Sequence, residues 1–567
     1  MAFQKTIGIT SMNKIEEALV KRLKNHRVIF WYDEKAELQE QFNELSFDGL
    51  EKIRVEGNEF ELKYLINKQK PKGKFLLYFS SPKPSNEENW LLDMELAHHV
   101  FHTDQEAMFL QEIGLGYHLK ELVAEHIEFF KSKERRQKLQ ELLGEDDEHE
   151  DIRGKMLAVL FNTDYLSLNT FIHAHSSAFI DGNERFDKEL DRYNLTTYYW
   201  GKIKHHFNYL NESPSIYDFL LEVFNGNFAL GENTDLTKES RLLLSLWKDT
   251  IQYRESFGRV ADKIAIDIDV EEKLQRAELS DIINDDLFRL TDRKIIHDLV
   301  GLISEESISY DKVSQFVKKR ENKYWFSHSQ FLYKSLEYGA ETISLIRKYS
   351  NASYGSFKQG IEDYASTFFE VDQAYRKFVW SYRQAKQNMI LADLALKIEK
   401  VYSNDWLLQN NNHWQEIIDG LDVWPTSERY SQQRFFEQHV RPFTVKKQRL
   451  FVIISDALRY ENGEELCRKL QSENRYESSV EPMVSSLPSY TQLGMASLLP
   501  NKKLSFQDNS DSILVDGMSS AGIQGRTKIL AENSGVRSVA VRAKDFMDMN
   551  SAKEGRDFVK NFDLIYI

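Results

Sequence analysis

Hydrophobic and polar residues alternate in two ways near the start of the chain. KIEEALVKRL and ELQEQFNEL have apolar residues at helical spacing, whereas HRVIFWYD is a short buried run typical of a strand. EKIRV, FELKYLI and KFLLYFS continue this alternation of helix and strand. The pattern predicts a small α/β domain with a parallel sheet over residues 1–90.

The long middle of the chain has a different pattern. Apolar residues recur at helical spacing, as in SRLLLSLWKDTI and AETISLIRKY, with almost no strand-like alternation. Proline breaks helix interiors, and between Pro84 and Pro425 the only proline is Pro214. Residues 91–435 are therefore predicted to form a helical scaffold of one or two subdomains.

The last segment, residues 436–567, returns to alternation. We expect strands at LFVII, YESSV, SILV, SVAV and LIYI, and helices at NGEELCRKLQ, TQLGMASLL, GRTKILAENS and SAKEGRDFVKN. This order is typical of a doubly wound α/β domain, in which functional residues gather at the carboxyl ends of the strands. The predicted fold class is α/β and α.

Composition narrows the class of protein. The chain has 567 residues, one cysteine and a net charge of −15. Cys467 cannot form an internal disulfide, the N-terminus lacks the layout of a secretory signal, and no apolar run approaches the roughly 20 residues of a membrane span. We therefore expect a multidomain cytoplasmic protein with no membrane partner.

The charge is unevenly distributed. From Arg441 onward the chain has 18 basic and 16 acidic residues, so the acidic excess lies in the first 440 residues. The negative total argues against a protein that binds nucleic acid through bulk electrostatics, but the near-neutral C-terminal segment is compatible with a phosphorylated substrate.

Two features of the C-terminal segment are candidates for chemistry. The strand LFVII runs directly into Ser455 and Asp456, a position where a carboxylate faces the crevice of a parallel sheet, although aspartate at such a turn is more commonly a cap. In the segment MVSSLPSYTQLGMASLLP, Ser489 and Gln492 fit an S-x-x-Q capping box, and Thr491 falls in the first helical turn.

Two interpretations of that second segment remain open. Ser489 can simply cap the helix, which would leave Thr491 without a role. Alternatively, a hydroxyl at the positive end of the helix dipole, close to a metal ion, becomes a nucleophile.

Other candidate groups favour structural roles. Asp33 follows a predicted strand and is expected to be a helix cap, and His98 and His102 have i, i+4 spacing on an expected helix without the H-E-x-x-H order. The acidic run at 144–151 is expected to be a solvated loop. The pairs His173/His175 and His205/His206, and the aromatic segment 193–210, are expected to be structural, the aromatic residues belonging to the core.

The two C-terminal motifs together resemble a known family. ISDALRYENGEEL followed by EPMVSSLPSYTQLGMASLLP is similar to the PglZ domain, a branch of the alkaline phosphatase superfamily, and the resemblance to PglZ proteins of type 1 BREX phage-defence systems extends over the whole chain. The most specific motifs are D-A-L-R-Y-E at 456–461 and P-S-x-T at 488–491.

The resemblance implies roles for these residues. Asp456 would be a metal ligand, Thr491 the nucleophile and a metal ligand, and Ser489 a substrate-binding hydroxyl and the rival nucleophile. A complete site in this superfamily holds two divalent ions, with zinc or manganese expected, and uses further aspartate and histidine ligands. The sequence has no histidine after His439 and stops at the apolar strand NFDLIYI. We therefore expect an incomplete site in a chain cut off at Ile567, one that binds metal poorly and is almost inactive.

The same resemblance implies an activity and partners. The intact protein would be a metal-dependent phosphatase or phosphodiesterase in phage defence, and the substrate could be a nucleic acid or another phosphoester. Its partners would be other BREX proteins, including the methyltransferase and BrxB, docked on the N-terminal regions. The alternative is a scaffold that assembles the defence complex without catalysis.

Overall fold

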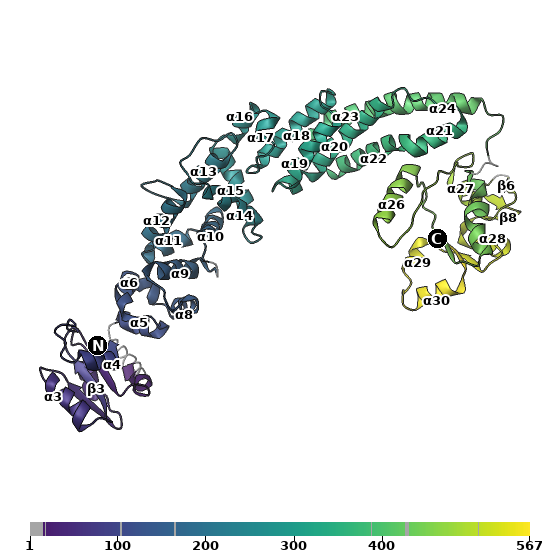
Figure 1. Ribbon diagram of the computed structural model, residues 1–567. Helices are drawn as coiled ribbons and strands as arrows, with labels where there is room; N and C mark the ends of the chain where they lie inside the picture. The colour runs from purple at the N-terminus through teal and green to yellow at the C-terminus, as the bar shows by residue number, and fades with distance from the viewer. Residues whose placement is uncertain are drawn as a thin grey trace. The chain divides into compact units, whose positions relative to one another are not determined.

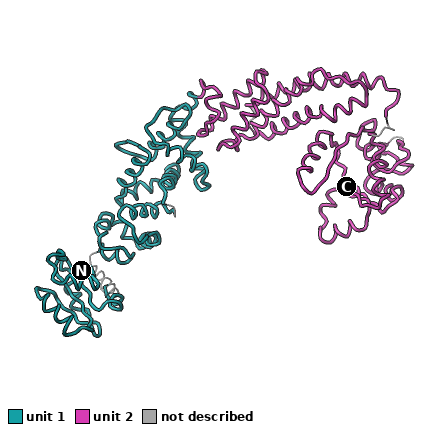
Figure 2. The backbone as a smooth tube through the Cα atoms, viewed as in Figure 1, with its two compact units in different colours: residues 1–273 teal, residues 274–567 magenta. Residues whose placement is uncertain are grey.

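The computed structural model describes residues 15–16, 19–102, 105–163, 166–386, 388–425, 430–507 and 510–567. The chain divides into two compact units, residues 1–273 and residues 274–567 (Figure 2). Mixed α/β structure with a largely helical content runs through them (Figure 1).

A four-stranded parallel sheet begins the first unit. Its strands are β1 (Val28–Tyr32), β2 (Leu50–Arg54), β3 (Lys74–Phe79) and β4 (His99–His102), in the order β2-β3-β1-β4. Successive β1 side chains enter opposite cores: Val28 and Phe30 pack on one face, Ile29 and Trp31 on the other. This period of two buries both faces, which explains the continuous apolar run in the sequence. The helical elements here are α2 (Gln39–Glu44), α3 (Glu59–Tyr64), the π-turn η1 (Leu65–Gln69) and α4 (Leu92–Ala97).

Strand β4 corrects an expectation about histidines. His98 and His102 were expected on one helix, but His102 lies in β4 and His98 ends α4, so the i, i+4 spacing brings no two ligands onto a helical face. The segment pairs with β1 from Ile29 to Tyr32, and this long-range pairing overrides the local helical pattern. The first predicted helix, 14–23, falls partly outside the described residues.

Asp33 has a structural role, close to the one expected from the sequence. Its buried carboxylate accepts hydrogen bonds from the backbone N–H groups of Glu37 (3.3 Å) and Leu38 (2.7 Å) and from the Tyr78 hydroxyl (2.5 Å). The carboxylate thus stabilises the turn after β1 instead of the first turn of α2, whose N-cap is Leu38.

Helices form the rest of the first unit. The expected aromatic core is present: Tyr199, Trp200, Ile203 and Phe207 are buried on one face of α12. His173 and His175 are buried in α10, and the acidic run is a loop only up to Glu148, where a capping box begins α9.

The helical elements of this part are α5 (Gln105–Ile113), η2 (Tyr117–Leu119), α6 (Lys120–Glu125), α7 (Ile127–Phe130), α8 (Lys133–Leu142), α9 (His149–Phe161), α10 (Leu168–Ile180), α11 (Arg185–Arg192), α12 (Thr196–Phe207), α13 (Ile216–Asn227), α14 (Glu239–Asp249), α15 (Arg254–Asp267) and α16 (Val270–Gln275). The last residues of α16 belong to the second unit.

The second unit begins with a helical scaffold, which we define as residues 274–425. Its longest helix, α20 (Phe326–Lys348), packs along α22 (Phe369–Gln384). A fully buried ion pair joins α18 (Arg289–Ser304) to α19 (Tyr310–Glu321) through Asp292 and Arg320. The remaining elements are α17 (Leu279–Ile282), α21 (Phe357–Asp363), η3 (Tyr364–Phe368), η4 (Asn388–Leu391), α23 (Ala392–Lys400), η5 (Val401–Leu408) and α24 (Gln409–Asp419).

The C-terminal segment contains two small sheets. Strands β5 (Leu450–Val452), β10 (Leu564–Tyr566) and β9 (Ser538–Ala540) are parallel, with β10 in the centre. Strands β6 (Leu504–Phe506), β7 (Ile513–Val515) and β8 (Met518–Ser519) form a separate antiparallel sheet. The other elements are η6 (Gln432–Arg434), η7 (Phe436–Val440), α25 (Arg441–Val445), α26 (Tyr460–Ser472), α27 (Thr491–Ser497), α28 (Gly522–Asn533), α29 (Ala543–Met547) and α30 (Glu554–Asn561).

Two strand predictions for this segment are wrong in part. YESSV, residues 476–480, is not a strand, and SILV contributes β7 to the antiparallel sheet instead of extending the parallel one. Both sequences have strand propensity, but tertiary pairing decides which segment enters which sheet. One apolar core, with Val452, Leu493, Ile529 and Leu564 among its members, joins the two sheets to α27 and α28.

Candidate active site

Asp456, Ser489 and Thr491 line a single cavity of about 550 Å³ in the C-terminal segment. Asp456 enters from the loop after β5, and the two hydroxyl residues enter from the loop before α27 and from its first turn. The cavity therefore lies at the carboxyl end of β5, where open parallel sheets commonly bind ligands. A different cavity, lined by Arg537 and Asp563, lies at the amino ends of β9 and β10.

The sheet positions the loop that carries Asp456. Hydrogen bonding to the central strand continues past β5: Ile567 N donates to Val452 O (2.8 Å) and Ile454 N donates to Ile567 O (2.9 Å). Asp456 comes two residues later. Ala457 has φ +56°, a left-handed conformation that costs a non-glycine residue about 1–2 kcal/mol. Such local strain is frequent at functional sites.

The opposite wall of the cavity is the extended stretch 483–486, which is held in place by residues 430–432. Val484 N donates to Tyr430 O (2.7 Å), and Gln432 N donates to Val484 O (2.9 Å). The Gln432 side chain accepts from Ser486 N (3.1 Å), and a serine pair, Ser486 with Ser497 of α27, is buried with 2.8 Å between its hydroxyl oxygens. The wall is thus fixed to both η6 and α27.

The start of α27 contradicts the capping interpretation of Ser489. The N-cap is Tyr490, in extended conformation and without a side-chain capping bond, and Thr491 is the first helical residue. The expected capping box of Ser489 with Gln492 is therefore absent, because the helix begins one residue later than that box requires. Ser489 and Thr491 are both exposed at the cavity. The peptide bond before Pro488 is cis.

The lining has a distinctive chemistry. Among the described residues around the cavity, Asp456 is the only charged one, and the hydroxyls of Ser455, Ser485, Ser489 and Thr491 lie with it. A lone carboxylate repels a phosphate, so an anionic substrate needs a cation between the two. Carboxylate and hydroxyl oxygens are suitable ligands for a hard divalent ion such as Mg²⁺ or Mn²⁺.

One carboxylate and a few hydroxyls do not by themselves complete the coordination of a metal ion. Nowhere in the described part of the chain do three or more His, Cys, Asp or Glu side chains form a group that could hold a metal ion. By their chemistry, the carboxylate and hydroxyl oxygens that line this cavity are compatible with a divalent ion, but a complete coordination shell would need further ligands.

Several residues of the site gave no signal in the sequence. Gln432 lies more than fifty residues before Ser486, and only the fold brings it to the cavity wall. Met483 and Tyr490 also line the cavity, but their side chains resemble ordinary apolar and aromatic residues in the sequence. The predicted capping box of Ser489 was wrong because the N-cap, Tyr490, is recognised only from its backbone dihedral angles.

The region around the cavity matches a described domain family. Residues 435–567 match the model of the BREX system PglZ alkaline phosphatase-like domain. This segment of the chain is thus similar to PglZ alkaline phosphatase-like domains of BREX systems. The matched segment contains the strands β5, β10 and β9, both walls of the cavity except Gln432, and the residues Asp456, Ser489 and Thr491.

Curated relatives extend the similarity beyond the PglZ domain. The alkaline phosphatase-like protein BrxZ of Escherichia coli O9:H4 (strain HS) is 28% identical over 580 residues, covering 96% of this chain and 66% of that protein. The alkaline phosphatase-like protein PglZ of Bacillus cereus (strain H3081.97) is 27% identical over 561 residues, covering 96% of this chain and 65% of that protein. The chain thus spans about two thirds of the length of these relatives.

Neither the solved structures nor the described helices of the chain add a further resemblance. No solved structure gives a significant match to the chain. Within the described residues, none of the helices combines the length and the apolar character needed to cross a bilayer.

Proposed function

We propose that this chain provides the nucleophile-bearing part of a metal-dependent phosphoester hydrolase in BREX phage defence, acting in the cytoplasm. The observation that carries this proposal is the shared cavity: one carboxylate and two exposed hydroxyls meet at the carboxyl end of β5, inside the segment that matches the PglZ domain.

Each of the three side chains has a distinct role in this proposal. Asp456 holds a divalent cation, with the Thr491 hydroxyl as a second oxygen ligand, and Ser489 donates a hydrogen bond to the phosphoester. When bound, such an ion supplies the positive charge that offsets Asp456, polarises the phosphoryl group and lowers the pKa of a coordinated hydroxyl. Thr491, the first residue of α27, then presents its oxygen as the nucleophile.

The oxygen-only lining affects the expected metal. Zinc usually takes at least one imidazole or thiolate, whereas manganese accepts carboxylate and hydroxyl oxygens. We therefore favour Mn²⁺ at the Asp456 side of the expected two-ion site, with zinc requiring histidine from elsewhere. The remaining ligands are proposed to lie in the part of the family's length that this chain does not span.

Partner binding is assigned to the rest of the chain. Residues 15–425 contain helical surface and a small sheet, and we propose that they dock other BREX proteins, the methyltransferase and BrxB among them. The substrate class is a phosphoester, with nucleic acid as one member.

A second function is favoured by one observation, the lack of any group of three or more metal-ligating side chains in the described residues. If the intact protein also lacks such a group, the PglZ domain serves as an assembly scaffold of the BREX complex and the cavity is a vestige of the fold.

Hydrolysis of bis-p-nitrophenyl phosphate by the intact protein, with and without Mn²⁺, separates the two functions. For a hydrolase, Thr491→Val and Asp456→Ala each reduce the metal-stimulated rate by 10³-fold or more, on the order expected when a nucleophile or its metal is removed. Ser489→Ala reduces it less, about 10–100-fold, as for one lost substrate hydrogen bond. The exposed Asp548 provides a matched control through Asp548→Asn, which leaves the rate unchanged. Equal rates in all variants would establish the scaffold.

A further inference from the structure

Helix α26 follows the Asp456 loop directly, yet it contributes no residue to the apolar core of the domain to which it belongs. The core of the PglZ domain includes Leu493 of α27 and Ile529 of α28, but among the described residues of that core none comes from 460–472. The only residues that α26 buries are Glu461 and Cys467. Within the domain its second half is held by polar contacts, in which Gln471 donates to Ser478 O (3.0 Å) and the Ser478 hydroxyl donates to Cys467 O (3.0 Å).

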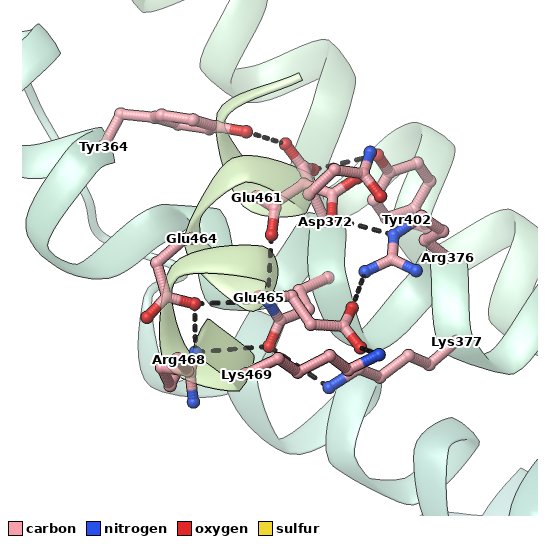
Figure 3. A network of polar contacts seen from close by, with 12 residues as sticks. Tyr364, Asp372, Arg376, Lys377, Tyr402, Glu461, Glu464, Glu465, Arg468 and Lys469 are labelled. Atoms are coloured by element: carbon pink, nitrogen blue, oxygen red, sulfur yellow. Dashed lines mark hydrogen bonds and ion pairs between the residues drawn. The ribbon is translucent and has the colours of Figure 1, made fainter. Parts of the chain in front are cut away.

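The first half of α26, which carries the buried Glu461, contacts α22 of the helical scaffold (Figure 3). The Arg376 guanidinium donates from Nε to Glu461 Oε2 (2.8 Å), and its second arm pairs with Glu465 one turn later. Gln373 donates to the Glu461 backbone oxygen (3.1 Å). The Glu461 side chain is only 3% exposed, so this carboxylate depends on Arg376 for its charge balance.

Aromatic contacts extend the same interface. The Tyr460 hydroxyl donates to Ala365 O (2.9 Å), and the Tyr460 ring meets that of Phe369 edge-on at 5.7 Å. Tyr460 is the first residue of α26, only four residues after Asp456. The loop 455–459 is thus tied at one end to the sheet through Ile454 and at the other end to the scaffold through Tyr460 and Glu461.

Helix α22 is itself firmly anchored within the scaffold. One turn before Arg376, the Asp372 carboxylate accepts hydrogen bonds from Tyr364 (2.5 Å) and Tyr402 (2.9 Å) (Figure 3). Tyr402 also stacks on Tyr375 with ring centroids 3.6 Å apart. The hydrogen bonds of Asp372 and the stacking of Tyr375 thus connect η3 and η5 to the part of α22 that carries Arg376.

We propose that Arg376 is a positioning residue: by clamping Glu461 and Glu465 it lets the helical scaffold set the position of the Asp456 loop. Events on the scaffold, such as the docking of a partner protein, would thereby control the metal affinity of the site. The coupling to metal rests on the proposed function of Asp456, whereas the clamp itself does not.

Hydrogen exchange of the whole chain without added metal tests the clamp. Arg376→Met keeps the aliphatic stem and removes the charge, leaving Glu461 buried without its cation. We expect the amides of Leu458, Asn462 and Gly463, which donate to Ser455 O and Arg459 O, to exchange at least about ten-fold faster, while β9 and β10 are unaffected. The matched control is Arg383→Met, an exposed arginine on the same helix, which should change nothing.

A second variant separates local loosening from general damage. Arg376→Met combined with Glu461→Met removes both charges, and an apolar pair of similar volume is tolerated in such places, so exchange should return to within about three-fold of the native rate. Glu465→Gln, which removes only the more exposed partner, should give an intermediate effect. Unchanged exchange in Arg376→Met, or failure of the double variant to restore it, would overturn the clamp.

Titration of the intact protein with Mn²⁺ alone, followed by electron paramagnetic resonance, tests the positioning role. Arg376→Met should weaken Mn²⁺ binding about ten-fold and the double variant should restore it. A loosened α26 with native Mn²⁺ affinity would refute positioning. If Asp456→Asn binds Mn²⁺ as tightly as the native protein, the proposed function fails instead, and the exchange result still decides the clamp.

Discussion

The buried ion pair between Asp292 and Arg320 should dominate the stability of the helical scaffold. Both side chains are 0% exposed, and the guanidinium binds the carboxylate with two hydrogen bonds, Nε to Oδ1 (3.0 Å) and a terminal nitrogen to Oδ2 (2.8 Å). Arg320 also donates to the backbone oxygens of Ile283 and Asp285, and the Tyr333 hydroxyl donates to Asp292. The network therefore joins α17, α18, α19 and α20.

Replacing Arg320 by methionine leaves Asp292 buried with only the Tyr333 hydroxyl as a charge-stabilising partner. Breaking a buried pair in this way costs about 3–5 kcal/mol. For a unit of this size the corresponding loss in Tm is on the order of 10 °C. Removing both charges, with Asp292→Leu added, should recover most of the loss because no uncompensated charge remains.

Thermal unfolding followed by circular dichroism, with hydrogen exchange of α18–α20 to localise the change, measures both effects. Arg293→Met, at an exposed arginine on α18, is the matched control. A loss below about 1 kcal/mol in Arg320→Met, or a double variant no more stable than the single one, would refute the reasoning.

Three further predictions concern single residues. Ala457 has φ +56°, so Ala457→Gly should be neutral or slightly stabilising in urea unfolding, whereas Ala457→Val should cost more than about 1 kcal/mol; equal stability of the two variants would contradict the left-handed turn. Hydrogen bonds from Arg347, together with Lys397, lower the pKa of Glu306 to about 2. The ionised Glu306 carboxylate therefore stabilises the fold fully above pH 4.5, and this stabilisation is lost as the pH falls towards 2. Glu306→Gln should lower the Tm at pH 7 but not at pH 2. Burial lowers the pKa of His173 to about 4, so between pH 6.5 and 4 the unfolded chain binds a proton that the folded chain does not, and stability falls as the pH falls through that window. His173→Gln should flatten this part of the profile of Tm against pH. An unchanged profile would contradict a neutral buried imidazole.

The sequence predicts most strongly those elements that its local pattern determines. The run VIFWY of β1 is buried on both faces, so its apolar continuity is sufficient to predict a strand in a parallel sheet. The aromatic face of α12 and the position of Asp456 after β5 are predictable for the same reason. In each case neighbouring residues in the sequence carry the signal.

Features that depend on distant pairing are not predictable in this way. His99–His102 joins the first sheet only because β1 is available beside it, and SILV becomes antiparallel because β6 and β8 flank it. Gln432 and Arg376 reach the cavity wall and α26 from more than fifty residues away. The N-cap of α27 is Tyr490 and not Ser489, and this shift of one residue leaves the Ser489 hydroxyl without the capping role that the sequence predicts.

The central claim is that Asp456 and Thr491 act on the same metal ion. Mn²⁺ titration of the intact protein, monitored by electron paramagnetic resonance in the native form, Asp456→Asn and Thr491→Val, tests it most directly, with Asp548→Asn as the control. We expect Asp456→Asn to weaken Mn²⁺ binding at least about 100-fold and Thr491→Val to weaken it about ten-fold and to alter the spectrum of the bound ion. Native affinity and an unchanged spectrum in both variants would contradict the claim.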